Sequence, residues 1–145
     1  MFMGEFQHNL DAKGRVFVPA RLRDGLGDCF VLTKGLDGCL FAFPTLGWRA
    51  LEQKLKSLSF TNSDSRKFLR FFFAGAVDCE IDKQGRILIP QKLREHAKIN
   101  KEAVIIGVSS RVEVWSAEVW EEYKNEAAVS YEDVAEKIIE DNVGL

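Results

Sequence analysis

This chain of 145 residues is long enough for one domain, or for two small halves that share a core. Hydrophobic residues make up 46% and charged residues 29%, which excludes a disordered or fibrous chain. The longest apolar run, residues 71–77, is far shorter than the ~20 residues of a membrane span. The net charge is −2, but it is unevenly distributed. Residues 1–112 hold 18 Lys and Arg against 12 Asp and Glu, whereas residues 113–145 hold two Lys against ten Asp and Glu. A basic body with an acidic tail hints at a polyanionic partner, or simply at a solvated terminal helix.

The first half of the chain predicts short strands, turns and helices in alternation. The predicted elements are a turn at 11–14, a strand at 16–18 and a short helix after Pro19. Strands at 29–33 and 40–43 follow, joined by a turn at 35–38, and then a helix from Pro44. The turn has the sequence Asp-x-x-Gly between β-forming residues, which indicates a hairpin, and Gly14 tolerates the positive φ that the turn needs. Thr45 is the predicted N-cap of the helix that follows.

The second half predicts the same elements after a connecting helix. That helix covers residues 63–73 and places Phe68, Leu69, Phe72 and Phe73 opposite Arg66, Lys67 and Arg70. The later elements are a turn at 82–85, a short helix after Pro90, strands at 103–108 and 112–115, and a helix capped by Ser116. A final helix at 130–143 has Val134, Ile138 and Ile139 on one side and acids on the other.

The two halves are copies of one unit. A shift of 71 positions aligns Asp11, Gly14, Arg15, Pro19, Leu22 and Arg23 with identical residues at 82, 85, 86, 90, 93 and 94, six identities in thirteen positions. A unit repeated only twice favours a pseudo-twofold pair over a solenoid. Because one such unit buries too little surface alone, we expect the two hairpin layers to interlock around a shared core.

Cysteine and histidine usage offers no redox or metal chemistry. Cys29, Cys39 and Cys79 are an odd set without C-x-x-C spacing, so we interpret them as reduced packing residues. His8 and His96 have no second ligand at metal-binding spacing, and we expect no metal and no cofactor. The N-terminus has no basic leader followed by an apolar stretch, so we expect no secretory signal and a cytoplasmic protein.

An enzyme is also disfavoured. The sequence has no Gly-rich phosphate loop, no G-x-S-x-G and no Cys-His pair. Asp11 and Asp82 could be imagined as paired carboxylates, but each has an arginine four residues further on that would keep it ionised.

Both copies of the motif carry the same local positive charge. Residues 11–23 hold Lys13, Arg15, Arg21 and Arg23 against Asp11, and residues 82–94 hold Lys83, Arg86, Lys92 and Arg94 against Asp82. A narrow β-hairpin can enter the DNA major groove, where arginine bonds guanine in bidentate fashion and lysines hold phosphates. The alternative is that each aspartate pairs with its arginine across the turn and only stabilises the fold. For the four basic residues of the short helices, a solvated helix face is the favoured interpretation.

The motif resembles a known family. Residues 11–19, DAKGRVFVP, and 82–90, DKQGRILIP, resemble the D-x-x-x-R signature of the MraZ family, and the resemblance runs over nearly the whole chain. It implies two AbrB/SpoVT-type swapped-hairpin halves in one polypeptide, and a ring-shaped homo-oligomer such as an octamer. It also implies a bacterial transcriptional regulator that binds direct repeats upstream of its own cell-division and cell-wall gene cluster. The arginine tied to DNA binding in the family falls on Arg15, with Lys13 and Asp11 beside it, and Arg86, with Lys83 and Asp82, matches in the second copy.

We therefore expect an α+β fold, mostly β, built as a tandem pseudo-twofold AbrB/SpoVT-like swapped-hairpin barrel with flanking helices. The expected divisions are a first half at 1–60, a connecting helix at 61–75, a second half at 76–128 and an acidic C-terminal helix at 129–145. The expected partners are double-stranded DNA and further copies of the chain, without a membrane, in the cytoplasm and associated with the nucleoid. The rival function is an antitoxin-like interaction module that uses the acidic C-terminal segment.

Overall fold

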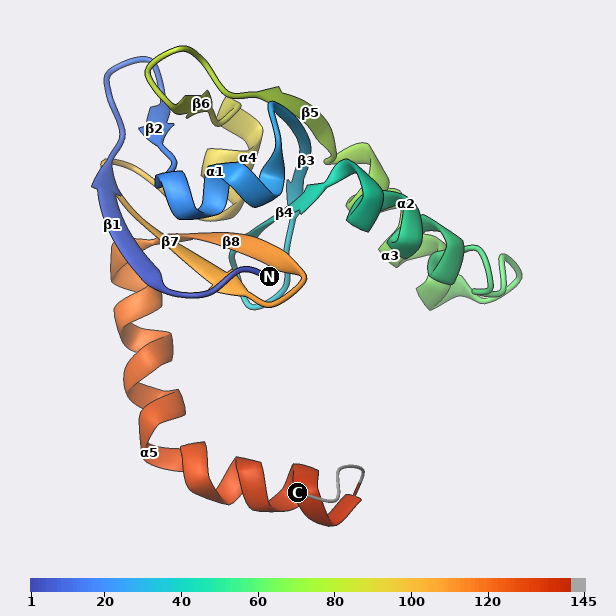
Figure 1. Ribbon diagram of the computed structural model, residues 1–145. Coiled ribbons are helices and arrows are strands. Elements are labelled where there is room, and N and C mark those ends of the chain that lie inside the picture. Colours follow the sequence, from blue (N-terminus) through green and yellow to red (C-terminus); the bar gives the residue numbers. More distant parts are fainter. Residues whose placement is uncertain (142–145) are drawn as a thin grey trace.

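The computed structural model describes residues 1–141 as eight strands and five helices (Figure 1). The first half contains β1 (Glu5–Asn9), β2 (Arg15–Phe17), α1 (Ala20–Leu26), β3 (Cys29–Lys34), β4 (Leu40–Pro44) and α2 (Thr45–Leu55). After α3 (Ser63–Ala74), the second half contains β5 (Val77–Glu80), β6 (Arg86–Leu88), α4 (Gln91–His96), β7 (Glu102–Val108), β8 (Arg111–Ser116) and α5 (Ala117–Asp141). The order of elements repeats between the halves, as the sequence predicts. Across residues 1–141, no helix combines the length and the apolar character that a bilayer crossing requires.

The strand order shows the pseudo-twofold symmetry directly. One antiparallel sheet has six strands in the order β1-β7-β8-β4-β3-β5. This order is the same from either end when each strand is exchanged for its repeat counterpart, β1 for β5, β3 for β7 and β4 for β8. A second sheet contains only β2 and β6, paired antiparallel with Val16 opposite Ile87 at the centre. The tandem pseudo-twofold α+β barrel is confirmed.

The halves exchange strands. β1 of the first half pairs with β7 of the second, and β5 of the second half pairs with β3 of the first. The expected local hairpin around residues 11–14 is therefore wrong in one respect, because the two strands beside the turn pair with different partners across the molecule. The physical reason is that β2 has three residues and its central Val16 is fully buried in the core that both halves build. The expected interlocking of the two layers is confirmed.

The core has two parts. The larger cluster is aliphatic and takes residues from both halves, among them Val16, Leu22, Leu32, Ile87 and Ile89. The smaller cluster is rich in aromatic side chains and packs against α2, α3 and the start of α5, and Trp48 of α2 stacks on Phe72 of α3 with ring centroids 5.4 Å apart. The arm formed by α2 and α3 projects from the barrel at one side, away from the point where α5 leaves it (Figure 1).

The helix starts agree with prediction in part. Ser116 caps α5, since its Oγ accepts a 3.5 Å hydrogen bond from the N–H of Val119. Thr45 is the first residue of α2 and not its cap, because Pro44 occupies the cap position and the Thr45 hydroxyl donates to the Cys29 carbonyl instead. The predicted helix at 63–73 is confirmed as α3, and Asn62 caps it by accepting from the N–H groups of Asp64 and Ser65.

The C-terminal helix is longer than expected. The separate helix predicted at 130–143 is the second half of α5, which runs from Ala117 to Asp141, and residues 142–143 lie outside the described residues. Figure 1 shows that α5 changes direction midway along its length. Near the middle of α5, the hydroxyl of Ser130 donates a hydrogen bond to the carbonyl of Glu126. A hydrogen bond of this kind often bends a helix. Among the cysteines, Cys39 and Cys79 are buried as expected, whereas Cys29 is exposed.

Candidate nucleic-acid interface

The two Asp-x-x-Gly turns lie side by side at one end of the barrel, where β2 and β6 begin (Figure 1). Backbone hydrogen bonds connect each turn to the opposite half, from Ile89 N–H to the Gly14 carbonyl at 3.0 Å and from Val18 N–H to the Gly85 carbonyl at 2.8 Å. The strand exchange thus brings together two sequence segments that are 71 residues apart. All six side chains predicted to form the site belong to these two turns.

The first turn is organised by Asp11. Its Oδ1 accepts hydrogen bonds from the backbone N–H groups of Lys13, at 3.0 Å, and Arg15, at 2.9 Å. Its Oδ2 accepts from Nε of Arg15 at 2.7 Å. Gly14 has a φ of +84°, which a residue with a Cβ rarely adopts. The turn is therefore held rigidly, with Lys13 exposed at its tip.

The second turn repeats this geometry around Asp82. Its Oδ1 accepts from the N–H groups of Gln84 and Arg86, both at 2.9 Å, and its Oδ2 accepts from Nε of Arg86 at 3.0 Å. Gly85 has a φ of +80°. Lys83 is exposed one position earlier than Lys13, because Gln84 occupies the place that corresponds to Lys13.

The two arginines differ in their partners. Arg86 contacts its own Asp82, donates from Nη2 to Gln84 at 3.3 Å, and reaches Asp11 of the first turn with Nη1 at 3.7 Å. Arg15 bonds only Asp11 through Nε, so that within residues 1–141 its two Nη groups have no protein acceptor. Arg86 therefore joins the turns, while Arg15 keeps the outer edge of its guanidinium available. The aspartate–arginine pairs that the sequence offers as an alternative do form, and they leave this edge open.

Electrostatics keep both aspartates ionised. The N–H of Arg15 lowers the pKa of Asp11 below its ordinary value, helped by the Arg15 guanidinium and the N–H of Lys13, and desolvation opposes them only in part. The N–H and guanidinium of Arg86 lower the pKa of Asp82 in the same way. The carboxylates act as fixed anions that orient arginines and are poor proton acceptors at neutral pH.

Arg23 and Arg94 pack against the glycines of the turns, a structural role that the sequence did not predict. Arg94 donates from Nε to the Ile89 carbonyl at 3.0 Å, and its guanidinium lies 2.8 Å from where a Cβ on Gly14 would be. Arg23 lies under Gly85 in the same way and places its guanidinium 5.2 Å from the Phe17 ring centroid. The solvated helix face predicted for these two residues is wrong, whereas Arg21 and Lys92 are exposed as predicted. The available signal was that Arg23 and Arg94 are among the six identities of the repeat.

This arrangement presents positive charge on a rigid surface of the barrel. Four cations, Lys13, Arg15, Lys83 and Arg86, are displayed on two narrow turns whose backbones are fixed. Residues 1–141 contain no cluster of three or more His, Cys, Asp or Glu placed to hold a metal ion. The barrel, with its exchanged strands and paired basic turns, places the chain in the AbrB/SpoVT-like class of swapped-hairpin folds.

Comparison with known proteins identifies the family within this class. The family described as "MraZ protein, putative antitoxin-like" matches residues 1–71 and again residues 72–142. A protein named transcriptional regulator MraZ from Pelotomaculum thermopropionicum is 68% identical over 100% of this chain and 100% of its own. One of the same name from Desulforamulus reducens is 61% identical over 97% of this chain and 99% of its own. A third, from Heliobacterium modesticaldum, is 62% identical over 97% of this chain and 98% of its own. This chain belongs to the MraZ family.

Proposed function

We propose that this chain regulates transcription by binding promoter DNA through its two basic turns, with Arg15 as the residue that reads bases. The observation that carries the proposal is the contrast between the two arginines. Arg86 contacts three side chains of the protein, whereas the Nη edge of the Arg15 guanidinium is free. The names of the relatives support the regulatory role.

The chemistry of the site matches the DNA major groove. A pair of adjacent turns is narrow enough to enter it, and an arginine can bond O6 and N7 of guanine, which is worth ~1–3 kcal/mol against a wrong base. Lys13 and Lys83 contact phosphates and set the register, while Asp11 and Asp82 hold the arginines in position. Arg86 contributes charge and the connection between the turns.

One chain is too weak to act alone. Turns that neutralise about three phosphates give a salt slope of only about −2.7, and such binding is feeble at physiological salt. Several copies linked in a ring, such as an octamer, raise the effective concentration of each later contact and strengthen binding ~10²–10⁴-fold. Direct repeats upstream of the chain's own cell-division and cell-wall gene cluster are the matching target, which places the protein on the nucleoid.

The test is a mobility-shift assay on the DNA upstream of the chain's own gene, with intact and scrambled tandem repeats. Arg15→Ala should weaken binding ~5–150-fold for each guanine that the arginine bonds, which is the fold-change equivalent of ~1–3 kcal/mol. Arg21→Ala is the matched control, because Arg21 is an exposed arginine of α1, outside the turns.

Circular dichroism and oligomer mass should be the same for both variants and the unchanged chain. The affinity of the unchanged chain should decline steeply with salt. Unaltered operator binding by Arg15→Ala, or binding indifferent to salt, would contradict the proposal.

The second candidate is an antitoxin-like interaction module, and the description of the matching family favours it. Its signature would be a small protein partner that copurifies with the chain and no longer does so when residues 126–145 are deleted. Operator binding that survives this deletion while the partner is released would show that the two activities are separate.

A further inference from the structure

The second half of α5 has an apolar face that stays exposed among the described residues, 1–141. The first half of α5 is fixed to the barrel, since Trp115 packs on Trp120 and Tyr123 with ring centroids 5.1 and 5.0 Å away, and Lys124 lies 3.6 Å from Glu5. Beyond Glu126, the side chains of Tyr131, Val134 and Ile138 form a helical stripe and are 72%, 46% and 51% exposed. Such a stripe on a projecting helix is typical of a surface that packs against another molecule.

This half of the helix is also strongly acidic. Residues 126–141 carry six acids and one base, Lys137. The acids are Glu126, Glu132, Asp133, Glu136, Glu140 and Asp141. A partner surface must therefore be apolar at its centre and basic around it.

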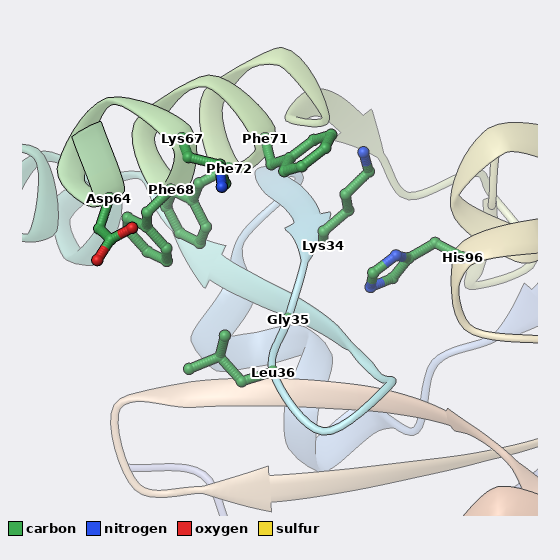
Figure 2. Close-up of a pocket in the computed structure, with 9 residues that line it drawn as sticks. All are labelled: Lys34, Gly35, Leu36, Asp64, Lys67, Phe68, Phe71, Phe72 and His96. Carbon is green, nitrogen blue, oxygen red and sulfur yellow. The ribbon is translucent and has the colours of Figure 1, made fainter.

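The same chain carries a surface of that kind on α3. A cavity of about 430 Å³ opens between α3 and the β3–β4 turn, and Figure 2 shows aromatic and basic side chains around it. Its lining includes Phe68 and Phe71 of α3 together with Lys34, Lys67 and His96, and Asp64 is its one acid. Phe71 is 62% exposed, and Nζ of Lys34 lies 4.8 Å from its ring centroid. A second hollow beside it is lined by Arg66, Lys67, Arg70 and Phe71, which extends the basic surface along α3.

We infer that the second half of α5 of one copy docks on this α3 surface of the next copy. The occupant follows from charge and shape: an acidic helix with a three-residue apolar stripe meets an aromatic hollow bordered by cations. The contact joins two different surfaces, and each chain uses both at once, so successive copies can close a ring. The inference rests on the oligomer proposed above and names the surfaces that build it.

The test uses complementary charge reversals in the full chain. One variant, Lys67→Glu with Arg70→Glu, makes the α3 surface repel α5, and another, Glu132→Lys with Glu136→Lys, makes α5 repel the α3 surface. Each alone should fall to the mass of one chain, 16.4 kDa, in sedimentation velocity. Mixed in equal amounts, the two should assemble again with the variants in alternation, because the α5 of each variant is complementary in charge to the α3 surface of the other. A chain with all four substitutions should recover the larger assembly.

The matched control is Arg49→Glu with Lys54→Glu, which reverses two exposed charges on α2 of the same arm, outside the cavity. It should keep the mass of the unchanged chain. Charge-reversed variants that keep this mass, a mixture that stays monomeric, or an unchanged chain that is monomeric would overturn the inference. Its failure is separable from that of the DNA-binding proposal, because a chain that keeps its ring after charge reversal and still binds its operator refutes only this inference. A ring that assembles as described but ignores the operator refutes only the DNA proposal.

Discussion

Asp11 is the one aspartate of the two turns that contacts the arginines of both. It accepts two backbone N–H groups of its own turn and lies beside arginines from both halves of the chain. Asp82 accepts the equivalent N–H groups, but only Asp11 has the second arginine within reach. Asp11 therefore links the two turns, and the arginine of its own turn is the one with the free edge.

Replacing Asp11 by Asn tests this role. The amide oxygen can still accept the N–H bonds, but the charge that holds Arg15 and Arg86 is removed. Because the folded chain lowers the pKa of Asp11, its carboxylate stabilises the fold above the ordinary value of 3.8, and this stabilisation is lost as pH falls through the lowered pKa. Urea unfolding should show Asp11→Asn less stable than the unchanged chain at pH 6, with the difference shrinking progressively as the pH falls below 3.8. Asp24→Asn, at an exposed position of α1, should follow the unchanged chain throughout. A difference that persists undiminished at low pH would refute the role of the charge.

At the scale of elements, the short ladder of β2 and β6 fixes the turns to the core. Each strand has three residues, and the central pair, Val16 and Ile87, is 0% and 2% exposed. Their neighbour Leu88 points outward. The turns therefore rely on two buried side chains from opposite halves more than on the length of the ladder.

Ile87→Ala should destabilise the chain by about 2–5 kcal/mol, because it removes buried methyl groups and leaves a cavity. It should also weaken operator binding, since both turns lead directly into this ladder. Leu88→Ala, the adjacent position on the solvent side, is the control and should change the free energy of unfolding by less than about 0.5 kcal/mol. Equal effects of the two substitutions in urea unfolding would show that the ladder is not the anchor.

The elements could be predicted from the sequence wherever a local pattern determines them. Asp-x-x-Gly, the prolines and the apolar runs locate both turns, the short helices and the strands, and the repeat predicts the symmetry. The partners of the strands could not be predicted in detail, because pairing depends on packing between halves. The roles of Arg23 and Arg94 depend in the same way on glycines of the opposite half. Thr45 failed as a cap because Pro44 already sits at that position with an extended backbone.

At the scale of the whole molecule, strand exchange makes the two halves interdependent. β1 completes the sheet of the second half and β5 that of the first, and the aliphatic core takes residues from both. Neither half encloses that core without strands supplied by the other. The positions of Arg15 and Arg86 are thus properties of the complete chain.

The complete chain should consequently unfold in a single transition. Trp48 reports on the first half through its stacking on Phe72, and Trp115, which is buried, reports on the second. In each chain that keeps only one of these tryptophans, with Phe at the other positions, tryptophan fluorescence and far-ultraviolet circular dichroism should give the same urea midpoint. Leu22→Ala and Leu93→Ala remove repeat counterparts that are 1% and 2% exposed, and each should lower that midpoint for both reporters. A mutation in one half should lower the urea midpoint reported from the other half by the same amount. Two separate midpoints, or a shift confined to the mutated half, would show that the halves fold independently.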